Sequence, residues 1–247
     1  TVELKQRSPE YNKLVNALFD IYLGEVPQQF SYKGKEYSPA SFASYLGLDM
    51  DNYVEITSFT HIPFYKKSTI EVPDNWDHAQ FYNVPLDEFM QIIDHALTKG
   101  YTVCWDGDVS ERGFSHANGV AINPEINDLS FMIGEDRARF EKLSVDDKYA
   151  EVYKFKEIFP EVNVTPEIRQ AGYESFTTTD DHLMLLTGIV KDQKGNKYYI
   201  TKNSWGTERN KFGGYLNMSE SFLRAKSISV MVHIESIPSE IRNKLGL

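Results

Sequence analysis

The sequence predicts an α+β fold, because helical periodicity dominates its first hundred residues and strand-like runs dominate its end. Apolar residues recur at helical spacing through 9–23, whereas 183–190 and 227–234 are short runs rich in apolar residues that favour strands. The chain has 247 residues, of which 41% are hydrophobic, so it is long enough to bury a substantial core.

The first hundred residues are predicted to form three helices and one hairpin. Helix 9–23 begins with a proline and is followed by a glycine, the residues that often start and stop helices. A short hairpin is expected over 32–37, and a second helix runs from Ser38-Pro39 to about Gly47. The third helix is expected over 86–99. Residues 51–84 are rich in Pro, Tyr and Asn, and we expect them to be irregular.

The remaining residues are predicted to form strands around a partly helical stretch, 126–171. The strands are expected over 101–105, 119–122, 183–190, 198–202 and 227–234. Turns at Gly195-Asn196 and Gly213-Gly214 separate the later strands. We therefore divide the chain into a mainly helical region, 1–99, and a β-rich region, 100–247.

Charge and composition argue against several kinds of partner and site. The formal net charge is −10 and no run of Lys and Arg interrupts it, so nucleic acid or an anionic membrane surface is not expected as a partner. No run of 18 or more apolar residues is present, so no membrane span is expected. The single cysteine, Cys104, excludes an internal disulfide and a cysteine-rich zinc site. No metal or other cofactor is implied.

The densest chemical signal is a histidine and an asparagine at the ends of two successive strand-like runs. His182 begins the first run, and Asn203 ends the second, within Lys-Asn-Ser-Trp-Gly. A polar turn joins the runs into a hairpin, which can bring the two side chains together. In cysteine peptidases a histidine takes the thiol proton, and a third polar group on its far nitrogen orients the ring. An asparagine can orient it without adding negative charge, and Trp205 could cover their hydrogen bond.

Lys-Asn-Ser-Trp-Gly followed by Gly-Gly-Tyr resembles the asparagine motif of papain-like cysteine peptidases. The Asp-Asp-His form of the histidine motif resembles the bacterial bleomycin hydrolase/aminopeptidase C branch, as do Glu-Val-Pro-Asp-Asn-Trp and Gly-Tyr-Thr-Val-Cys-Trp-Asp-Gly-Asp-Val-Ser-Glu. The resemblance implies a papain-like fold, with a helical left-lobe remnant over 1–99 and a right lobe over 100–247. It also implies aminopeptidase action on peptides, with His182 as base and then acid, Asn203 as its orienting partner and Trp205 as their shield.

The nucleophilic cysteine that this resemblance requires is not found in the sequence. Papain-like enzymes place it at the start of a buried helix, about 130–150 residues before the histidine, with an oxyanion-hole glutamine upstream. Cys104 lies much closer to His182, ends a strand-like run and precedes Asp106 and Asp108, which would raise the pKa of a thiol. We interpret Cys104 as structural. The cysteine and glutamine are expected on a companion N-terminal chain, separated by proteolytic processing.

Three alternatives stay open. The chain could be a catalytically inert papain-like fragment or a binding scaffold. It could be an N-terminal nucleophile hydrolase that uses Thr1, although the polar residues after Thr1 lead to a helix rather than a buried strand. A metal hydrolase would need Asp180, Asp181 and His182 as ligands, but consecutive residues of a strand point in alternating directions.

Further residues are candidates for contacts with substrate or for no chemical role. The expected substrate pocket residues are Trp105, Asp106, Asp108 and Asp181, with Trp76 as a further candidate. The other histidines lack a partnered motif, and we interpret them as surface or hydrogen-bonded residues: His61, His78, His95, His116 and His233. Similarity to exported bacterial relatives favours a secreted or periplasmic location, with the cytoplasm as the alternative. Homo-oligomer formation is left open.

Overall fold

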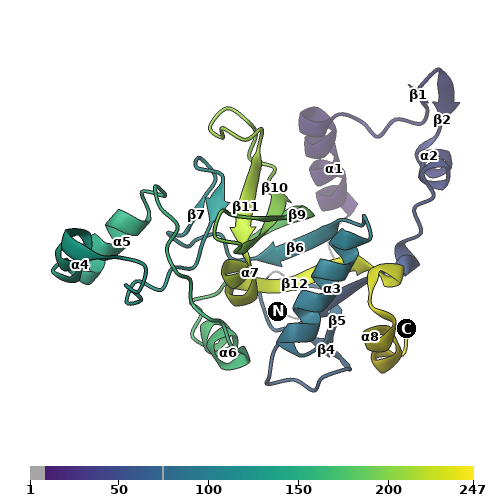
Figure 1. The fold of residues 1–247 in the computed structure, drawn as a ribbon. Coiled ribbons are helices and arrows are strands. Elements are labelled where there is room, and N and C mark those ends of the chain that lie inside the picture. Colours follow the sequence, from purple (N-terminus) through teal and green to yellow (C-terminus); the bar gives the residue numbers. More distant parts are fainter. Residues whose placement is uncertain (1–8, 74) are drawn as a thin grey trace. The chain divides into compact units, whose positions relative to one another are not determined.

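The computed structural model describes residues 9–73 and 75–247, and the chain divides into two compact units between Met50 and Asp51 (Figure 1). Thr1, the nucleophile of one alternative hypothesis, lies outside the described residues. The division predicted between residues 99 and 100 concerns lobes of a larger fold and stays a prediction.

The first unit has the predicted helices and hairpin. Helix α1 spans Pro9–Leu23, strands β1 (Phe30–Tyr32) and β2 (Lys35–Tyr37) form the hairpin, and helix α2 spans Pro39–Leu46. The hydroxyl of Ser38 accepts a hydrogen bond from the Ser41 amide, and the Ser41 hydroxyl accepts one from the Ser38 amide. Aromatic rings join the hairpin to α2, with Tyr37 and Phe42 packed edge to face 5.3 Å apart.

The second unit contains one large mixed sheet and six α-helices among residues 51–73 and 75–247. Its strands are β3 (Tyr53–Thr57), β4 (Lys67–Thr69), β5 (Gln80–Asn83), β6 (Val103–Gly107), β7 (Phe114–Ser115), β8 (Val120–Ala121), β9 (His182–Lys191), β10 (Lys197–Lys202), β11 (Tyr215–Ser219) and β12 (Ser227–His233). Its helices are α3 (Leu86–Thr98), α4 (Gly134–Glu141), α5 (Val145–Val152), α6 (Pro166–Glu174), α7 (Glu220–Lys226) and α8 (Ser239–Leu245). The strand order is β4-β5-β3-β12-β6-β9-β10-β11-β8-β7.

The two faces of the central strands differ in burial. On one face Ile56, Val230, Trp105 and Met184 pair across β3, β12, β6 and β9, and all four are buried in the core with α3. Their neighbours on the opposite face form the row Glu55, Met231, Cys104 and Leu185. These side chains remain partly or largely exposed. We call this second surface the open face.

Three parts of the sequence prediction were wrong. Residues 51–84 are not irregular, because they contain β3, β4 and β5, whose short lengths and intervening prolines hide any period. Strand β6 continues through Asp106 to Gly107, beyond the predicted end of the strand at residue 105. Strand β11 and helix α7 were not predicted, and the hydroxyl of Ser219 caps α7 by accepting a hydrogen bond from the Phe222 amide.

Candidate active site

His182 and Asn203 meet at the open end of the β9–β10 hairpin. His182 is the first residue of β9, and Asn203 directly follows β10, which pairs antiparallel with β9. The ring nitrogen Nε2 of His182 lies 2.9 Å from Oδ1 of Asn203. Asn203 is only 2% exposed, whereas His182 is half-buried at the rim of a hollow. The structure therefore brings together the two residues that the sequence pairs.

The partners of Asn203 determine which nitrogen of His182 carries the proton. The backbone amide of Ser204 donates to Asn203 Oδ1 over 2.7 Å, so this atom is the amide oxygen and an acceptor. His182 Nε2 must then be the donor, and in the neutral ring Nδ1 is left unprotonated. An imidazole held in this way offers Nδ1 to take a proton from a neighbouring group.

The loop that carries Asn203 is organised by a second buried asparagine, which the sequence analysis did not identify. The side-chain oxygen of Asn210 accepts from the backbone amides of Phe212 and Gly214 over 2.7 and 3.0 Å. Its Nδ2 donates to the carbonyls of His116 and Tyr215 over 2.7 and 2.9 Å. The amide of Asn203 in turn donates to the Gly214 carbonyl over 3.0 Å. The only sequence signal was an asparagine shortly before Gly213-Gly214, which is typical of turns.

Trp205 lies against the histidine. The indole and the His182 ring are 5.0 Å apart between centroids and tilted by 33°. The indole also makes edge contacts with Phe114 and His116, each at 5.6 Å. Trp205 is nevertheless 52% exposed, so one part of it covers the imidazole while the rest is open.

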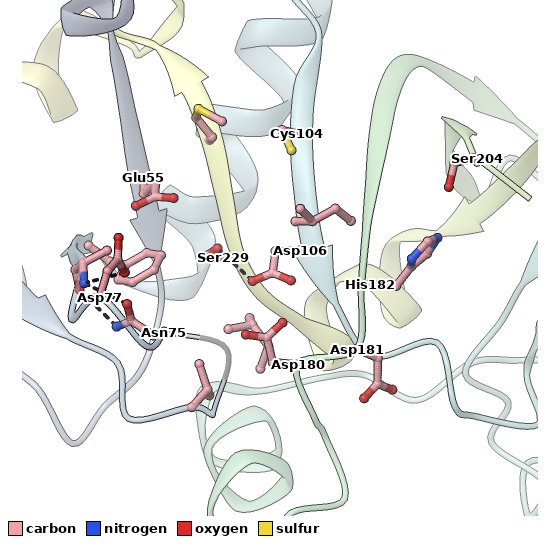
Figure 2. Close-up of a pocket in the computed structure, with 16 residues that line it drawn as sticks. Glu55, Asn75, Asp77, Cys104, Asp106, Asp180, Asp181, His182, Ser204 and Ser229 are labelled. Carbon is pink, nitrogen blue, oxygen red and sulfur yellow. Dashed lines mark hydrogen bonds between the residues drawn. The ribbon is translucent and has the colours of Figure 1, made fainter. Parts of the chain in front are cut away.

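A hollow of about 660 Å³ opens beside His182 on the open face. Figure 2 shows Glu55 and Asp77 on one side, His182 and Ser204 on the other, and Asp106 and Asp180 between them. No Lys or Arg is found among the described residues that line it. Of the predicted pocket residues, Asp106 and Asp181 line the hollow together with Cys104. Its local charge is therefore negative.

Comparison with known proteins places the fold. Residues 130–246, a range that contains His182 and Asn203, match the sequence model of the Peptidase C1-like family. PepW from Lactobacillus rhamnosis HN001 has a similar structure, with a TM-score of 0.65 and 18% identity over 95% of this chain. Residues 130–246 are therefore similar to the Peptidase C1-like family, and the chain shares its fold with PepW.

Two further results define the extent of the likeness. This chain spans 49% of the PepW chain, about half its length. The bromelain protease from Ananas comosus, solved in complex with the E64 inhibitor, matches with a TM-score of 0.30 and 14% identity over 58% of this chain and 45% of bromelain, a likeness too low to support an argument. No curated protein sequence matches the chain. The predicted papain-like α+β fold is confirmed.

Cys104 lies within the hollow of this papain-like chain but in surroundings that disfavour a thiolate. It is half-buried on β6, beside Asp106 on the same strand, and Met231 of β12 is its cross-strand neighbour. Burial, and then the negative charges of Asp106 and Glu55, raise the pKa of the Cys104 thiol above its usual value. The direction agrees with the sequence interpretation, although Glu55 replaces Asp108 as the second carboxylate. A raised pKa leaves less thiolate at any given pH, which is the reverse of what a nucleophile needs.

We expect iodoacetamide at pH 7.5 to alkylate Cys104 more slowly than free cysteine, because less of the thiol is ionised. Asp106→Asn removes one of the charges that raise this pKa and should increase the rate. Mass spectrometry of the chain over time measures both rates. Alkylation of Cys104 faster than free cysteine would contradict this assignment.

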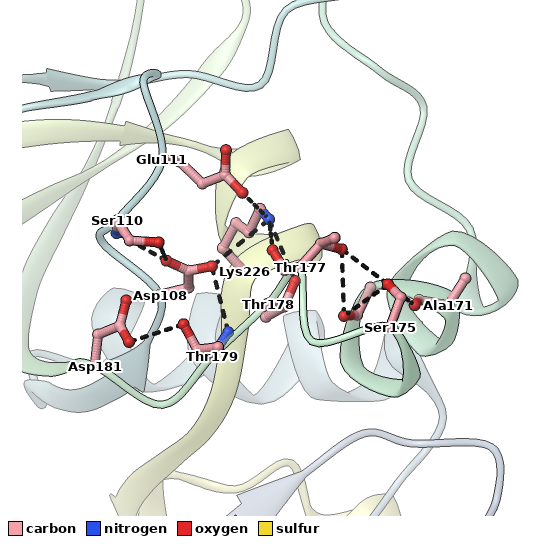
Figure 3. A network of polar contacts seen from close by, with 11 residues as sticks. Asp108, Ser110, Glu111, Ala171, Ser175, Thr177, Thr178, Thr179, Asp181 and Lys226 are labelled. Atoms are coloured by element: carbon pink, nitrogen blue, oxygen red, sulfur yellow. Dashed lines mark hydrogen bonds and ion pairs between the residues drawn. The ribbon is translucent and has the colours of Figure 1, made fainter.

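Asp108 does not line the hollow and belongs instead to the polar network shown in Figure 3. It is buried, and it accepts hydrogen bonds from the Ser110 amide and hydroxyl over 2.8 and 2.7 Å and from the Thr179 amide over 3.3 Å. Lys226 Nζ is 3.7 Å from Asp108 and donates to the Thr177 carbonyl over 2.6 Å. Burial raises the pKa of Asp108, and the proximity of Asp181 acts in the same direction. The network attaches the segment before His182 to the end of β6.

The two candidate tryptophans of the pocket do not line it either. Trp105 is fully buried on the core face of the sheet, where its indole NH donates to the Ser227 hydroxyl over 2.7 Å. Trp76 is largely exposed, and its neighbours Asn75 and Asp77 line the hollow instead. For Trp105 the reason is alternation along β6, which sends Cys104 and Asp106 to the open face and Trp105 to the other.

The other histidines lie in hydrogen-bonded or exposed positions. His95 contacts the Ser236 carbonyl and His61 contacts Gln170, as expected for hydrogen-bonded residues, whereas His116 contacts Asn203. Across residues 9–73 and 75–247, no group of three or more His, Cys, Asp or Glu side chains is arranged to hold a metal ion. None of the helices in that part of the chain is both long and apolar enough to cross a membrane.

Proposed function

We propose that this chain supplies the histidine and asparagine of a papain-like cysteine peptidase of the bleomycin hydrolase/aminopeptidase C kind. The nucleophilic cysteine and the oxyanion-hole glutamine would lie on a companion segment. The observation that carries the proposal is the 2.9 Å contact between His182 Nε2 and Asn203 Oδ1, with Trp205 against the imidazole at the rim of an open hollow.

The proton assignment gives each residue its part in the reaction. Nδ1 of His182 would take the thiol proton of the companion cysteine, and Asn203 would stabilise the imidazolium through Nε2–H. The thiolate sulfur would bond to the substrate carbonyl carbon while the C=O electron pair moves to the oxygen. As the C–N bond breaks, His182 would return the proton to the leaving amine. Water, deprotonated by the same nitrogen, would then hydrolyse the thioester.

Exposed apolar residues beside the site support a companion segment on the open face. Leu183 is 61% exposed and Leu185 is 38% exposed, although both lie in the middle of the sheet, on β9. Leu183 directly follows His182 on β9, and exposed apolar residues in such a place commonly mark interfaces. The similar PepW chain is about twice as long as this one, so PepW contains a long stretch beyond the part that this chain matches.

The charge of the hollow supports an amino-terminal mode of cleavage. Three aspartates line the hollow near His182. Asp180 and Asp181 directly precede it in sequence, and Asp106 pairs across the strands with Leu183, the next residue. No Lys or Arg is found among the described lining residues. An aminopeptidase must accommodate the positively charged amino terminus of its substrate next to the scissile bond, and carboxylates stabilise such a group. Export from the cell and homo-oligomer formation remain predictions from the sequence.

The test is intact-mass spectrometry of the native protein before and after an epoxide inhibitor that labels papain-like cysteines. We expect one inhibitor molecule on a companion segment and no change in the mass of residues 1–247. Peptide mapping then locates the labelled cysteine. Label on Cys104, or no label anywhere, would overturn the proposal and leave an inert scaffold.

A further inference from the structure

The amide nitrogen of Asn203 has one hydrogen-bond acceptor among the described residues, and this is a second histidine. Asn203 is almost fully buried, and its Oδ1 is occupied by the Ser204 amide and by His182. Its Nδ2 lies 3.4 Å from Nδ1 of His116, in the turn between β7 and β8. A buried amide nitrogen that lacks an acceptor is costly, so this contact is needed to hold the side chain in place.

The contacts of His116 are consistent with a single protonation state. Because the amide nitrogen of Asn203 can only donate, Nδ1 of His116 must accept, and its proton therefore lies on Nε2. Nε2–H donates a hydrogen bond to the carbonyl of Gly206 over 3.3 Å. Both ring nitrogens thus contact the loop that carries Asn203 and Trp205.

The turn that carries His116 is itself attached to this loop. Asn210 donates to the His116 carbonyl over 2.7 Å, and the His116 ring meets the Trp205 indole at 70°. Gly119, at the end of the turn, has a positive φ of 64°, and a Cβ there would lie 2.2 Å from the Phe212 ring. This close approach requires glycine and fixes the turn against the loop.

We propose that His116 is a positioning residue that holds the Asn203 amide, and through it Oδ1, in place for His182. Its catalytic meaning rests on the proposed peptidase function, but the hydrogen bond can be tested without any nucleophile. His116 orients Asn203 as Asn203 orients His182. A series of side-chain hydrogen bonds then connects the β7–β8 turn, the loop after β10 and the first residue of β9.

The experiment measures solvent exchange of the Asn203 side-chain amide protons by NMR, with the resonances assigned through Asn203→Asp. His116→Phe keeps an aromatic ring at this position but removes the Nδ1 acceptor, so exchange of the Asn203 amide protons should become about tenfold faster. In His116→Asn the side-chain oxygen takes roughly the place of Nδ1, and exchange should return to within about threefold of the unmodified chain. Asn118→Ala is the matched control, because it alters the same turn without contacting Asn203, and it should leave the rate unchanged.

Equal exchange in His116→Phe and the unmodified chain would overturn the proposal, as would exchange in His116→Asn as fast as in His116→Phe. These outcomes are independent of the inhibitor experiment. Absence of inhibitor label would remove the peptidase function and leave the hydrogen bond intact, whereas unchanged exchange would remove the role of His116 and leave the His182–Asn203 pair as it is.

Discussion

Replacing His182 by alanine in the proposed peptidase, which would consist of this chain and its proposed companion segment, should lower kcat/KM by about 10³-fold, within the range of about 10²–10⁴ for general acid–base catalysis. The effect should fall mainly on kcat, because in the proposed mechanism His182 would move the proton in both acylation and deacylation. Peptide hydrolysis under steady-state conditions measures it, and circular dichroism verifies that the variant is folded.

Asn203→Ala separates orientation from proton transfer within the same prediction. A hydrogen bond to a charged group contributes about 1.5–3 kcal/mol, so this variant should lose about 10- to 100-fold, less than His182→Ala. His78→Asn is the control, because it removes an exposed imidazole outside the hollow and asparagine tolerates the positive φ of 58° there. Activity of His182→Ala within tenfold of the unmodified enzyme would contradict the role of His182.

The central pair of the site could be predicted because it depends on local topology. Two strand-like runs joined by a polar turn must form a hairpin, and residues at its open end must meet. The hairpin indicated that His182 and Asn203 could come together, the resemblance to the papain-like motif strengthened that expectation, and the structure shows the contact. The Lys-Asn-Ser-Trp-Gly motif additionally placed Trp205 beside them.

The supporting residues could not be predicted because their contacts cross long stretches of sequence. His116 precedes Asn203 by 87 residues, and the turn that carries it is held near the site by long-range contacts, among them the parallel pairing of β8 with β11. Asp108 was expected in the substrate pocket on the strength of the resemblance to papain-like peptidases. The network with Lys226, which is 118 residues further on, buries it instead. Such burial depends on the tertiary fold rather than on local pattern.

Strands β3, β4 and β5 were missed for a related reason. They are three to five residues long, and β3 pairs with β5 in parallel across the segment that contains Pro63 and Pro73. Parallel pairing leaves no hairpin turn to recognise. By contrast, the long helices α1 and α3 have periodic apolar positions and glycine after their ends, and their limits agree with the prediction within one residue.

Arg169 provides the largest expected effect on stability, because it is a buried cation that joins three parts of the second unit. It lies on α6 with 2% exposure, and its Nε donates to the Ser58 carbonyl over 2.7 Å. Its terminal nitrogens donate to the carbonyls of Arg224 over 3.0 Å and of Ile228 over 3.5 Å. The guanidinium also lies 4.7 Å from the Phe59 ring. Burial, and then the charge of Arg224, lower the pKa of Arg169.

Arg169→Ala should lower the free energy of unfolding by about 3 kcal/mol, since it leaves buried carbonyls without donors and opens a cavity. Loss of a buried charge offsets part of this cost. Arg169→Met fills much of the volume but donates no hydrogen bond. If the hydrogen bonds dominate, this variant should lower the free energy of unfolding by at least half as much as Arg169→Ala does. Arg137→Ala, which removes a half-exposed pair with Glu141, should change stability by about 0.5 kcal/mol or less. Urea unfolding measures the stability of all three variants, provided that the m-value is unchanged. If Arg169→Met is as stable as the unmodified chain, packing rather than hydrogen bonding to the three carbonyls accounts for the role of Arg169.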